Sequence, residues 1–141
     1  MVSGIGHAAF GCADLERTLD FYCRGIGLRE AFRLYNDRGE TWIVYVQVRG
    51  LDFIEFFPDP RVRGGAPAEH PYRHLCLMVD DMDATLTDLA GRGVLADGPK
   101  RQGKDGNWQA WLTDPDGNRI ELMQIMPDSP HQRAADAFPG G

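Results

Sequence analysis

Two histidines and two glutamates in this chain have side chains that bind metal ions, and they recur at a matched spacing. His7 precedes Glu55 by 48 residues, and His74 precedes Glu121 by 47. Imidazole nitrogens and carboxylate oxygens together suit a divalent ion such as Ni²⁺, Co²⁺, Zn²⁺, Mn²⁺ or Fe²⁺. Four protein ligands on a six-coordinate ion leave two positions for water or a chelating substrate. We therefore expect one catalytic metal site.

The matched spacing belongs to an internal repeat with an offset of 66 to 67 residues. Residues 7–19 align with residues 74–86, and residues 51–56 align with residues 117–122. Such self-similarity indicates two copies of one structural unit. If the halves fold alike, a pseudo-two-fold axis brings both His–Glu pairs to equivalent places.

The repeat predicts a single domain over residues 1–126, built from modules 4–58 and 71–126. Residues 59–70 are rich in Pro, Gly and Arg and are expected to form an exposed linker. Residues 127–141 form a C-terminal tail, either mobile or laid over a surface, with one helical turn possible at 134–138. His70 and His131 lie outside the repeat and are interpreted as surface residues.

Each half predicts the element order βαβββ, which favours an α+β fold. Asp14 and Asp81 each precede an apolar stripe of helical spacing and are the expected helix N-caps. In the first half strands are expected at 5–12, 29–35, 41–48 and 51–57. In the second half they are expected at 74–79, 94–99, 108–113 and 118–124, with a tight turn at 114–117.

Strand alternation places the two glutamates on the face opposite to their apolar neighbours. Glu55 lies between Ile54 and Phe56, and on its own face it is flanked by Phe53 and Phe57. A carboxylate among aromatic rings is costly to bury without a positive partner. A bound metal ion would be such a partner.

Composition excludes several classes of protein. The chain has 141 residues and a net charge of −6, which argues against a nucleic-acid partner because phosphate binding needs a basic face. No apolar run approaches membrane-spanning length. Three widely spaced cysteines without a visible secretory signal predict reduced thiols in the cytoplasm. The tryptophans are expected in the core, with Trp108 a candidate for the pocket wall.

Several motifs resemble the vicinal oxygen chelate superfamily (glyoxalases, bleomycin resistance proteins and dioxygenases). They are the opening His7, the helix motif Asp14-Leu-x-x-Thr-x-x-Phe-Tyr22, Ile54-Glu55, His74, and Asp114-Pro-Asp-Gly-Asn-x-Ile-Glu121. The ligand pattern is closest to bacterial glyoxalase I. The resemblance implies paired βαβββ modules forming a cupped mixed sheet around the metal, normally in a homodimer.

The resemblance also implies a lyase or isomerase activity that depends on one divalent metal, with Ni, Co or Zn expected first and Mn or Fe as alternatives. The substrate would be a small molecule that binds through adjacent oxygens, and Glu121 or Glu55 would take a proton from the carbon beside its carbonyl. The positions that contact glutathione in glyoxalase I are Gly11 and Asp59 here. These residues argue against a glutathione adduct as the substrate.

Two other activities in the same superfamily are alternatives. Ring-cleaving extradiol-type dioxygenases use two His and one Glu with iron, which would correspond to His7, His74 and Glu121. The fourth candidate ligand, Glu55, argues against that reading because it fills a position that O₂ needs. A non-catalytic antibiotic-binding protein is the second alternative, and the intact ligand set argues against it. The sequence leaves open the identity of the metal, the substrate and whether Glu55 or Glu121 is the base.

Overall fold

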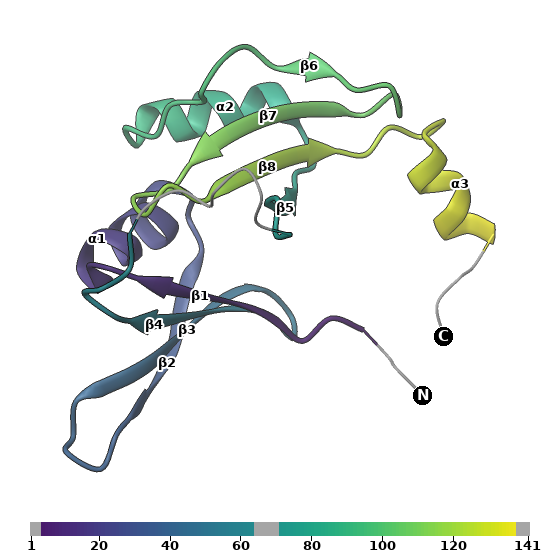
Figure 1. The fold of residues 1–141 in the computed structure, drawn as a ribbon. Coiled ribbons are helices and arrows are strands. Elements are labelled where there is room, and N and C mark those ends of the chain that lie inside the picture. Colours follow the sequence, from purple (N-terminus) through teal and green to yellow (C-terminus); the bar gives the residue numbers. More distant parts are fainter. Residues whose placement is uncertain (1–3, 64–70, 138–141) are drawn as a thin grey trace. The chain divides into compact units, whose positions relative to one another are not determined.

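The computed structural model describes residues 4–63 and 71–137. The chain divides into two units, Met1–Gly65 and Ala66–Gly141 (Figure 1). Each unit contains one mixed four-stranded sheet, with strand orders β1-β4-β3-β2 and β5-β8-β7-β6. The strand orders correspond one to one, so the two halves of the sequence repeat have the same topology. The α+β fold with tandem modules is confirmed.

The first unit follows the predicted order, with one addition after the helix. Its elements are β1 (His7–Cys12), α1 (Leu15–Leu19), the π-helical turn η1 (Asp20–Gly25), β2 (Arg29–Tyr35), β3 (Thr41–Arg49) and β4 (Asp52–Pro58). The sequence predicted one helix here and did not distinguish its π-helical end. All four strands lie within two residues of their predicted bounds.

The second unit repeats this order and adds a helix at its end. Its elements are β5 (Leu75–Met78), α2 (Met82–Gly91), β6 (Arg101–Gln102), β7 (Trp108–Thr113), β8 (Arg119–Gln124) and α3 (Pro130–Ala137). The tail therefore forms a longer helix than the single turn expected at 134–138, of which residue 138 lies outside the described residues. His70 and part of the 59–70 linker also lie outside them.

The strand predicted at 94–99 is wrong. The sheet's edge strand is instead β6, which pairs Arg101 with Gln109 and Gln102 with Trp108. Residues 94–99 are irregular, although the amide of Asp97 donates to the carbonyl of Trp111 at 2.8 Å. Pro99 has no amide hydrogen to donate to a ladder, and Gly98 beside it disfavours extended pairing.

Both helices begin at the predicted caps. The Asp14 carboxylate accepts from the amide of Arg17 at 3.2 Å, and the Asp81 carboxylate accepts from the amide of Ala84 at 2.9 Å. Each cap satisfies an amide that the first helical turn leaves without a partner. Because the caps occupy equivalent places in the repeat, each helix begins eight residues after the candidate histidine of its unit, Leu15 after His7 and Met82 after His74.

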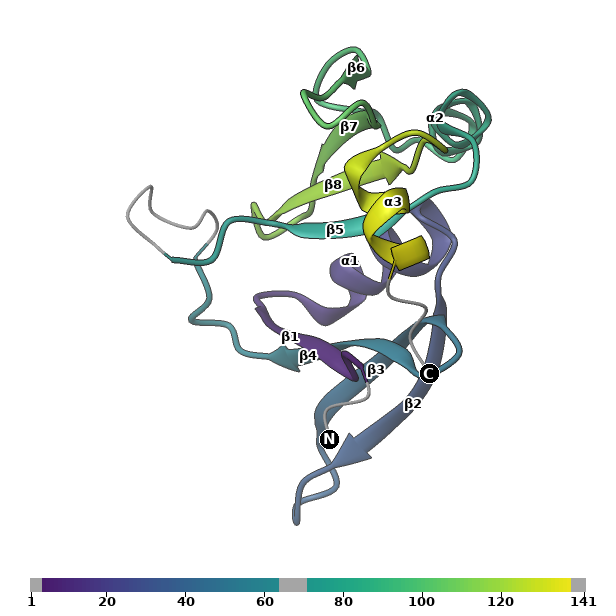
Figure 2. The same cartoon turned by 90° about the vertical axis from the view of Figure 1, so that its right-hand side faces the viewer.

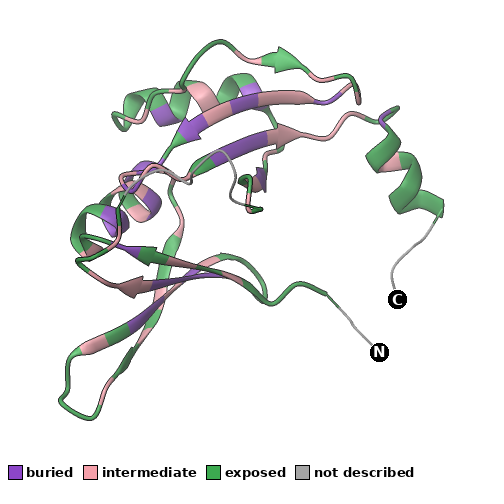
Figure 3. Cartoon of the chain, in the orientation of Figure 1, coloured by how far each residue is buried: buried purple, intermediate pink, exposed green. Residues whose placement is uncertain are grey.

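Each helix covers the apolar face of its own sheet. In the first unit the ring of Tyr22 lies 4.7 Å from that of Phe56, and Ile54 is also fully buried. In the second unit α2 packs against β7 and β8, where Leu112, Ile120 and Leu122 are buried. Figure 3 shows buried segments along β7 and β8. The opposite face of each sheet is therefore the one that carries Glu55 or Glu121.

The three tryptophans do not lie in the core as expected. Trp42 is 54% exposed, and Trp108 and Trp111 are half-buried. Cys12 is fully buried. In the described ranges, no helix combines the length and the apolar character needed to cross a membrane.

Candidate metal-binding site

The sheet topology brings each candidate histidine next to its candidate glutamate. β1 runs parallel to β4 and β5 runs parallel to β8 (Figures 1 and 2). Ala9 is the register partner of Glu55, and Cys76 is the register partner of Glu121. In both units the histidine precedes that partner by two residues. It therefore shares the face of the glutamate.

In the first unit the His7 Nε2 atom lies 3.3 Å from the Glu55 Oε2 atom. The Glu55 side chain is only 7% exposed, whereas that of His7 is 51% exposed. The imidazole therefore forms the accessible side of the pair. The carboxylate lies below it, inside the sheet face.

Tyr45 on β3 is a further member of this pair that the sequence did not reveal. It is the register partner of Glu55, and its hydroxyl donates a hydrogen bond to the Glu55 carboxylate. This hydrogen bond, followed by partial burial and the nearby negative charge, raises the pKa of the Tyr45 phenol. The phenol is therefore a donor throughout the neutral range, and it holds one carboxylate oxygen of Glu55 in place.

Aromatic rings surround the first pair. The Tyr45 ring stacks on Phe32 with centroids 4.3 Å apart, and Phe53 meets Tyr45 edge-on at 6.1 Å. His7 in turn meets Tyr45 edge-on at 6.4 Å. The prediction that Glu55 shares its face with aromatic residues is confirmed for Phe53. The rings limit the water that reaches the carboxylate, which makes a positive partner more necessary.

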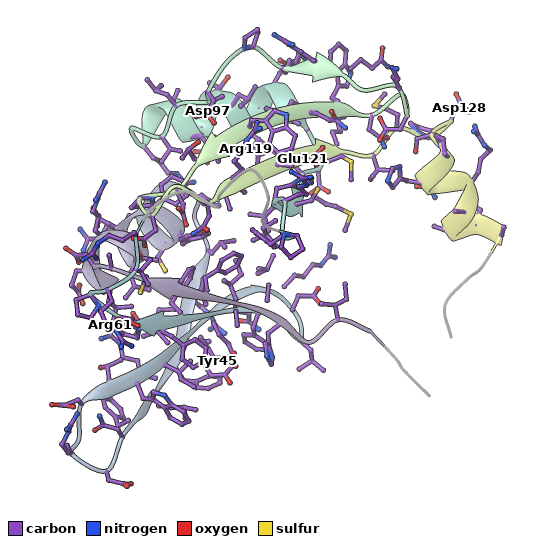
Figure 4. The ribbon with its side chains drawn as sticks, in the orientation of Figure 1. Tyr45, Arg61, Asp97, Arg119, Glu121 and Asp128 are labelled. Atoms are coloured by element: carbon purple, nitrogen blue, oxygen red, sulfur yellow. The ribbon has the colours of Figure 1, made fainter. Side chains whose placement is uncertain are left out.

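In the second unit the His74 Nε2 atom lies 2.8 Å from the Glu121 Oε2 atom. The Glu121 side chain is 8% exposed and that of His74 is 35% exposed, the same division as in the first pair. Trp111 takes the place of Tyr45: it is the register partner of Glu121, and its ring meets His74 edge-on at 4.9 Å. Figure 4 shows Glu121 on β8 and Tyr45 on β3.

Cys76 lies on the same strand pair but does not join the chemistry of the site as a nucleophile. Burial, and secondly the negative charge of Glu121, raises the pKa of the Cys76 thiol to about 11. A thiol with so high a pKa is almost wholly protonated at neutral pH and is a poor nucleophile.

The donors in each unit fit a divalent metal ion. Each pair combines one imidazole and one buried carboxylate, and the histidine Nε2 atom lies no more than 3.3 Å from a glutamate oxygen. Across residues 4–63 and 71–137, neither carboxylate forms an ion pair with a lysine or an arginine. A buried carboxylate needs a positive partner, and a metal ion held jointly with the imidazole would supply it.

The predicted ligands thus occur as two pairs, each within one unit. Among the residues that the structure describes, no group of three or more His, Cys, Asp or Glu side chains has the arrangement of a metal site. His131, predicted at the surface, is exposed, and its Nδ1 atom lies 3.0 Å from the Asn107 side-chain nitrogen.

The two positions that differ from glyoxalase I have structural roles in this chain. A Cβ atom on Gly11 would lie 2.9 Å from a Val62 methyl group, so no longer side chain fits there without displacing Val62. Asp59 forms a two-pronged ion pair with Arg61, with both contacts at 2.9 Å. The Arg61 hydrogen bonds lower the pKa of the Asp59 carboxyl to about 2.

A sequence model of the Glyoxalase/Bleomycin resistance protein/Dioxygenase superfamily matches residues 4–122 of the chain. Two bacterial proteins described as uncharacterized are similar over most of their length. YwkD of Bacillus subtilis (strain 168) is 25% identical over 88% of this chain and 98% of its own. YaeR of Escherichia coli (strain K12) is 27% identical over 85% of this chain and 95% of its own.

Solved structures with the same fold include a glyoxalase family protein from Enterococcus faecalis, with a TM-score of 0.73, 20% identity, and coverage of 85% of this chain and 96% of that one. TnmS3, an antibiotic binding protein from Streptomyces sp. CB03234, has a TM-score of 0.65 and 27% identity over 89% and 98% of the two chains. Lactoylglutathione lyase from Agrobacterium tumefaciens has a TM-score of 0.64 and 22% identity over 87% and 94%.

Proposed function

Because the chain belongs to the Glyoxalase/Bleomycin resistance protein/Dioxygenase superfamily, we propose that it is a metal-dependent lyase or isomerase of the glyoxalase I-like type. Its metal ligands would be His7, Glu55, His74 and Glu121, which together hold one divalent ion, with Ni, Co or Zn expected first. The observation that carries the proposal is the duplicated His–Glu pair, in which each carboxylate is buried without a lysine or arginine partner in the described ranges.

The reaction would be the removal of a proton from the carbon beside a carbonyl group of a substrate that carries two adjacent oxygens. When bound, the metal ion supplies Lewis-acid stabilisation of the negative charge that this step creates. The protein supplies the base. A carboxylate shielded from water and placed beside the reacting carbon is suited to that role.

The contacts of the two glutamates favour Glu121 as the base. Glu55 is held on two sides, by His7 and by the Tyr45 hydroxyl. For Glu121 the described residues provide one polar side-chain contact, the Nε2 atom of His74. Glu121 can therefore move toward a substrate with the loss of fewer protein contacts, while Glu55 serves as a fixed ligand.

The substrate is proposed to be something other than a glutathione adduct. In glyoxalase I an arginine and an asparagine contact glutathione, and here Gly11 is crowded by Val62 while Asp59 is engaged by Arg61. The likeness to lactoylglutathione lyase from Agrobacterium tumefaciens, at 22% identity, concerns the fold alone.

An exchange experiment in D₂O tests the proposed reaction. The metal-loaded protein is incubated with a panel of 2-hydroxy ketones, 2-hydroxy acids and hemithioacetals of small thiols, and NMR follows deuterium entry at the carbon beside the carbonyl. We expect exchange with at least one compound, a loss of about 100-fold or more in Glu121→Gln, and normal exchange in Glu40→Gln, an exposed control.

Two outcomes would replace the proposal with one of its alternatives. O₂ consumption with a catechol and iron, with no proton exchange on any compound, would identify a ring-cleaving dioxygenase. Binding of small molecules without exchange or O₂ consumption would identify a binding protein, the description carried by the 27% identical TnmS3.

A further inference from the structure

A hollow lies beside the His74–Glu121 pair, entirely within the second unit. Its volume is about 290 Å³, close to the lower limit for small-molecule sites. Six residues line most of it: Asp97, Pro99, Arg101, Gln109, Trp111 and Arg119. We call it the arginine pocket. Figure 4 shows two of its members, Asp97 and Arg119, together with Glu121.

The arginine pocket and the His74–Glu121 pair share one face of the second sheet. Trp111 is the register partner of Glu121, and Arg119 is two residues before Glu121 on β8. Residues two apart on a strand lie on the same side, so Arg119 and Glu121 both lie on the face opposite to helix α2. The Trp111 ring bridges the two features, since it meets His74 at 4.9 Å and carries the Arg119 guanidinium 4.2 Å above its centroid.

The charges of the arginine pocket favour an anion. Within the described residues neither Arg101 nor Arg119 forms an ion pair, although the chain as a whole has a net charge of −6. The one acidic side chain in the lining, Asp97, accepts a hydrogen bond from the Thr113 hydroxyl at 2.8 Å. Two guanidinium groups against one carboxylate leave the lining with an excess of one positive charge.

The side chains also have the shape that recognises an oxyanion. Guanidinium groups donate paired, parallel hydrogen bonds that match the two oxygens of a carboxylate or phosphate. Stacking on Trp111 restricts the orientation of the Arg119 guanidinium, which lowers the entropy lost when it binds. The Gln109 amide adds a neutral donor, and the indole ring adds a flat apolar wall.

We infer that the arginine pocket binds the carboxylate or phosphate of a small organic acid whose adjacent oxygens reach the neighbouring His74–Glu121 pair. The position of the adjacent oxygens at a metal ion rests on the proposed function. Binding of the carboxylate or phosphate in the arginine pocket does not depend on it. The chemical class of substrate is thus a compact acid that carries a vicinal pair of oxygens at one end and an oxyanion at the other.

Two ligands that differ by one carboxylate provide the test. Calorimetry measures binding of catechol and of 3,4-dihydroxybenzoate to the zinc-loaded protein, and metal per chain is counted after each titration. We expect 3,4-dihydroxybenzoate to bind about 10- to 100-fold more tightly, as lost hydrogen bonds to a charged group cost that much. Arg101→Gln and Arg119→Gln should each remove most of this preference and leave the zinc content unchanged.

Arg92→Gln is the matched control, because it removes the same charge from the second unit at the end of α2, outside the pocket. A second arm uses metal-free protein with benzoate and with inorganic phosphate, so it stays informative if the proposed metal site fails. We expect benzoate or phosphate binding that weakens in Arg101→Gln and Arg119→Gln; the tighter of the two anions identifies the group carried by the substrate.

The inference is overturned if catechol and 3,4-dihydroxybenzoate bind the zinc-loaded protein equally well. It is also overturned if Arg101→Gln and Arg119→Gln behave like Arg92→Gln in both arms. A loss of zinc in the wild-type protein, with anion binding that still depends on the two arginines, would contradict the proposed function and support the arginine pocket.

Discussion

Replacement of Tyr45 by phenylalanine tests how the first His–Glu pair is held for metal binding. The substitution removes the hydroxyl that donates to the Glu55 carboxylate. It keeps the ring, which stacks on Phe32 with centroids 4.3 Å apart. The fold of the sheet should therefore survive, and the change should act on the orientation of Glu55 alone.

The expected effect is a loss of about tenfold in metal affinity. Removal of a hydrogen-bond partner from a metal ligand generally costs about 10- to 100-fold. Glu55 keeps its contact with His7 at 3.3 Å, and Tyr45 itself is only half-buried, so water replaces part of the lost bond. These two features place the expected loss at the lower end of the range.

The effect should not change between about pH 6 and pH 9. The pKa of the Tyr45 phenol is raised above its ordinary value of 10 by the Glu55 hydrogen bond. Because the pKa is raised, the protonated phenol, which donates the hydrogen bond, is favoured. The contribution of the Tyr45 hydroxyl to metal affinity is therefore complete at pH values below the ordinary pKa of 10 and is lost only as the pH rises past the raised pKa. Wild type and Tyr45→Phe should therefore converge only in strongly alkaline solution.

Competition with a chromophoric chelator measures the zinc or nickel affinity of wild type, Tyr45→Phe and Tyr35→Phe. Tyr35 lies on the neighbouring strand β2 and is 60% exposed, so its substitution controls for the loss of a phenol from the same sheet. Equal metal affinity in Tyr45→Phe and Tyr35→Phe, or a deficit of Tyr45→Phe that is present only at alkaline pH, would show that the Tyr45 hydroxyl does not hold Glu55 for metal binding.

Three further predictions concern the stability and ionisation of the two units. Asp114 is buried and accepts three hydrogen bonds within the turn before β8, from the amides of Asp116 and Asn118 and the Asn118 side chain, at 2.7–3.0 Å. Asp114→Ala should therefore lower the free energy of unfolding by about 2–4 kcal/mol in urea titrations. Asn36→Ala also removes three hydrogen bonds from a turn, but these bonds are exposed to solvent. It should lower the free energy of unfolding clearly less than Asp114→Ala. Equal losses in the two variants would show that burial of the Asp114 hydrogen bonds does not determine their contribution. Asp59 should titrate near pH 2 by NMR, because Arg61 lowers the pKa of its carboxyl group. Arg61→Gln should raise the midpoint of the Asp59 titration toward about 4. An unchanged midpoint would exclude Arg61 as the cause of the lowered pKa. The pKa of Asp59 is lower in the folded protein than in the unfolded chain. Asp59 therefore stabilises the fold at pH values above its unfolded-state pKa, and this stabilisation is lost as the pH falls toward 2. Asn107 is fully buried, contacts His131 at 3.0 Å and accepts a hydrogen bond from the amide of Met126 at 2.9 Å. Asn107→Ala should therefore speed hydrogen exchange at the amides of α3 more than at the amides of the second sheet. An equal increase in α3 and in the sheet would show that Asn107 does not hold α3.

The sequence was sufficient to predict the features that depend on order along one strand or helix. The repeat identified the two modules, and the helix caps Asp14 and Asp81 were found from one side chain and the apolar stripe that follows it. Period-two alternation placed Glu55 and Glu121 on the face away from the core. The repeat also predicted that the two His–Glu pairs occupy equivalent places, whereas the contact of each histidine with its glutamate depends on the parallel pairing of β1 with β4 and of β5 with β8.

Features that depend on register between strands could not be predicted in the same way. Tyr45 and Trp111 flank the two glutamates only because β3 and β7 pair with β4 and β8 at one particular offset. A single sequence contains no direct signal for that offset. The tryptophan assigned to the pocket wall was Trp108, whereas Trp111, three residues later on the same strand and on its other face, has that position.

The strand predicted at 94–99 was wrong for a related reason. Its apolar residues suggested a strand, but the Gly98-Pro99 pair stops the ladder, and the polar residues Arg101 and Gln102 form the edge instead. The tail helix was underestimated because none of its residues is buried and it is held by polar contacts such as Asn107–His131, which leave no apolar period in the sequence.

The central claim is that Glu55 and Glu121, with the two histidines, bind one divalent metal ion. Elemental analysis of the purified and metal-reloaded protein tests this most directly, with wild type, Glu55→Gln and the exposed control Glu40→Gln compared side by side. We predict about one Ni, Co, Zn or Mn per chain in wild type and control, and a clearly lower content in Glu55→Gln. Iron retained equally in all three forms would exclude Glu55 as a ligand, and no metal in any form would contradict the claim altogether.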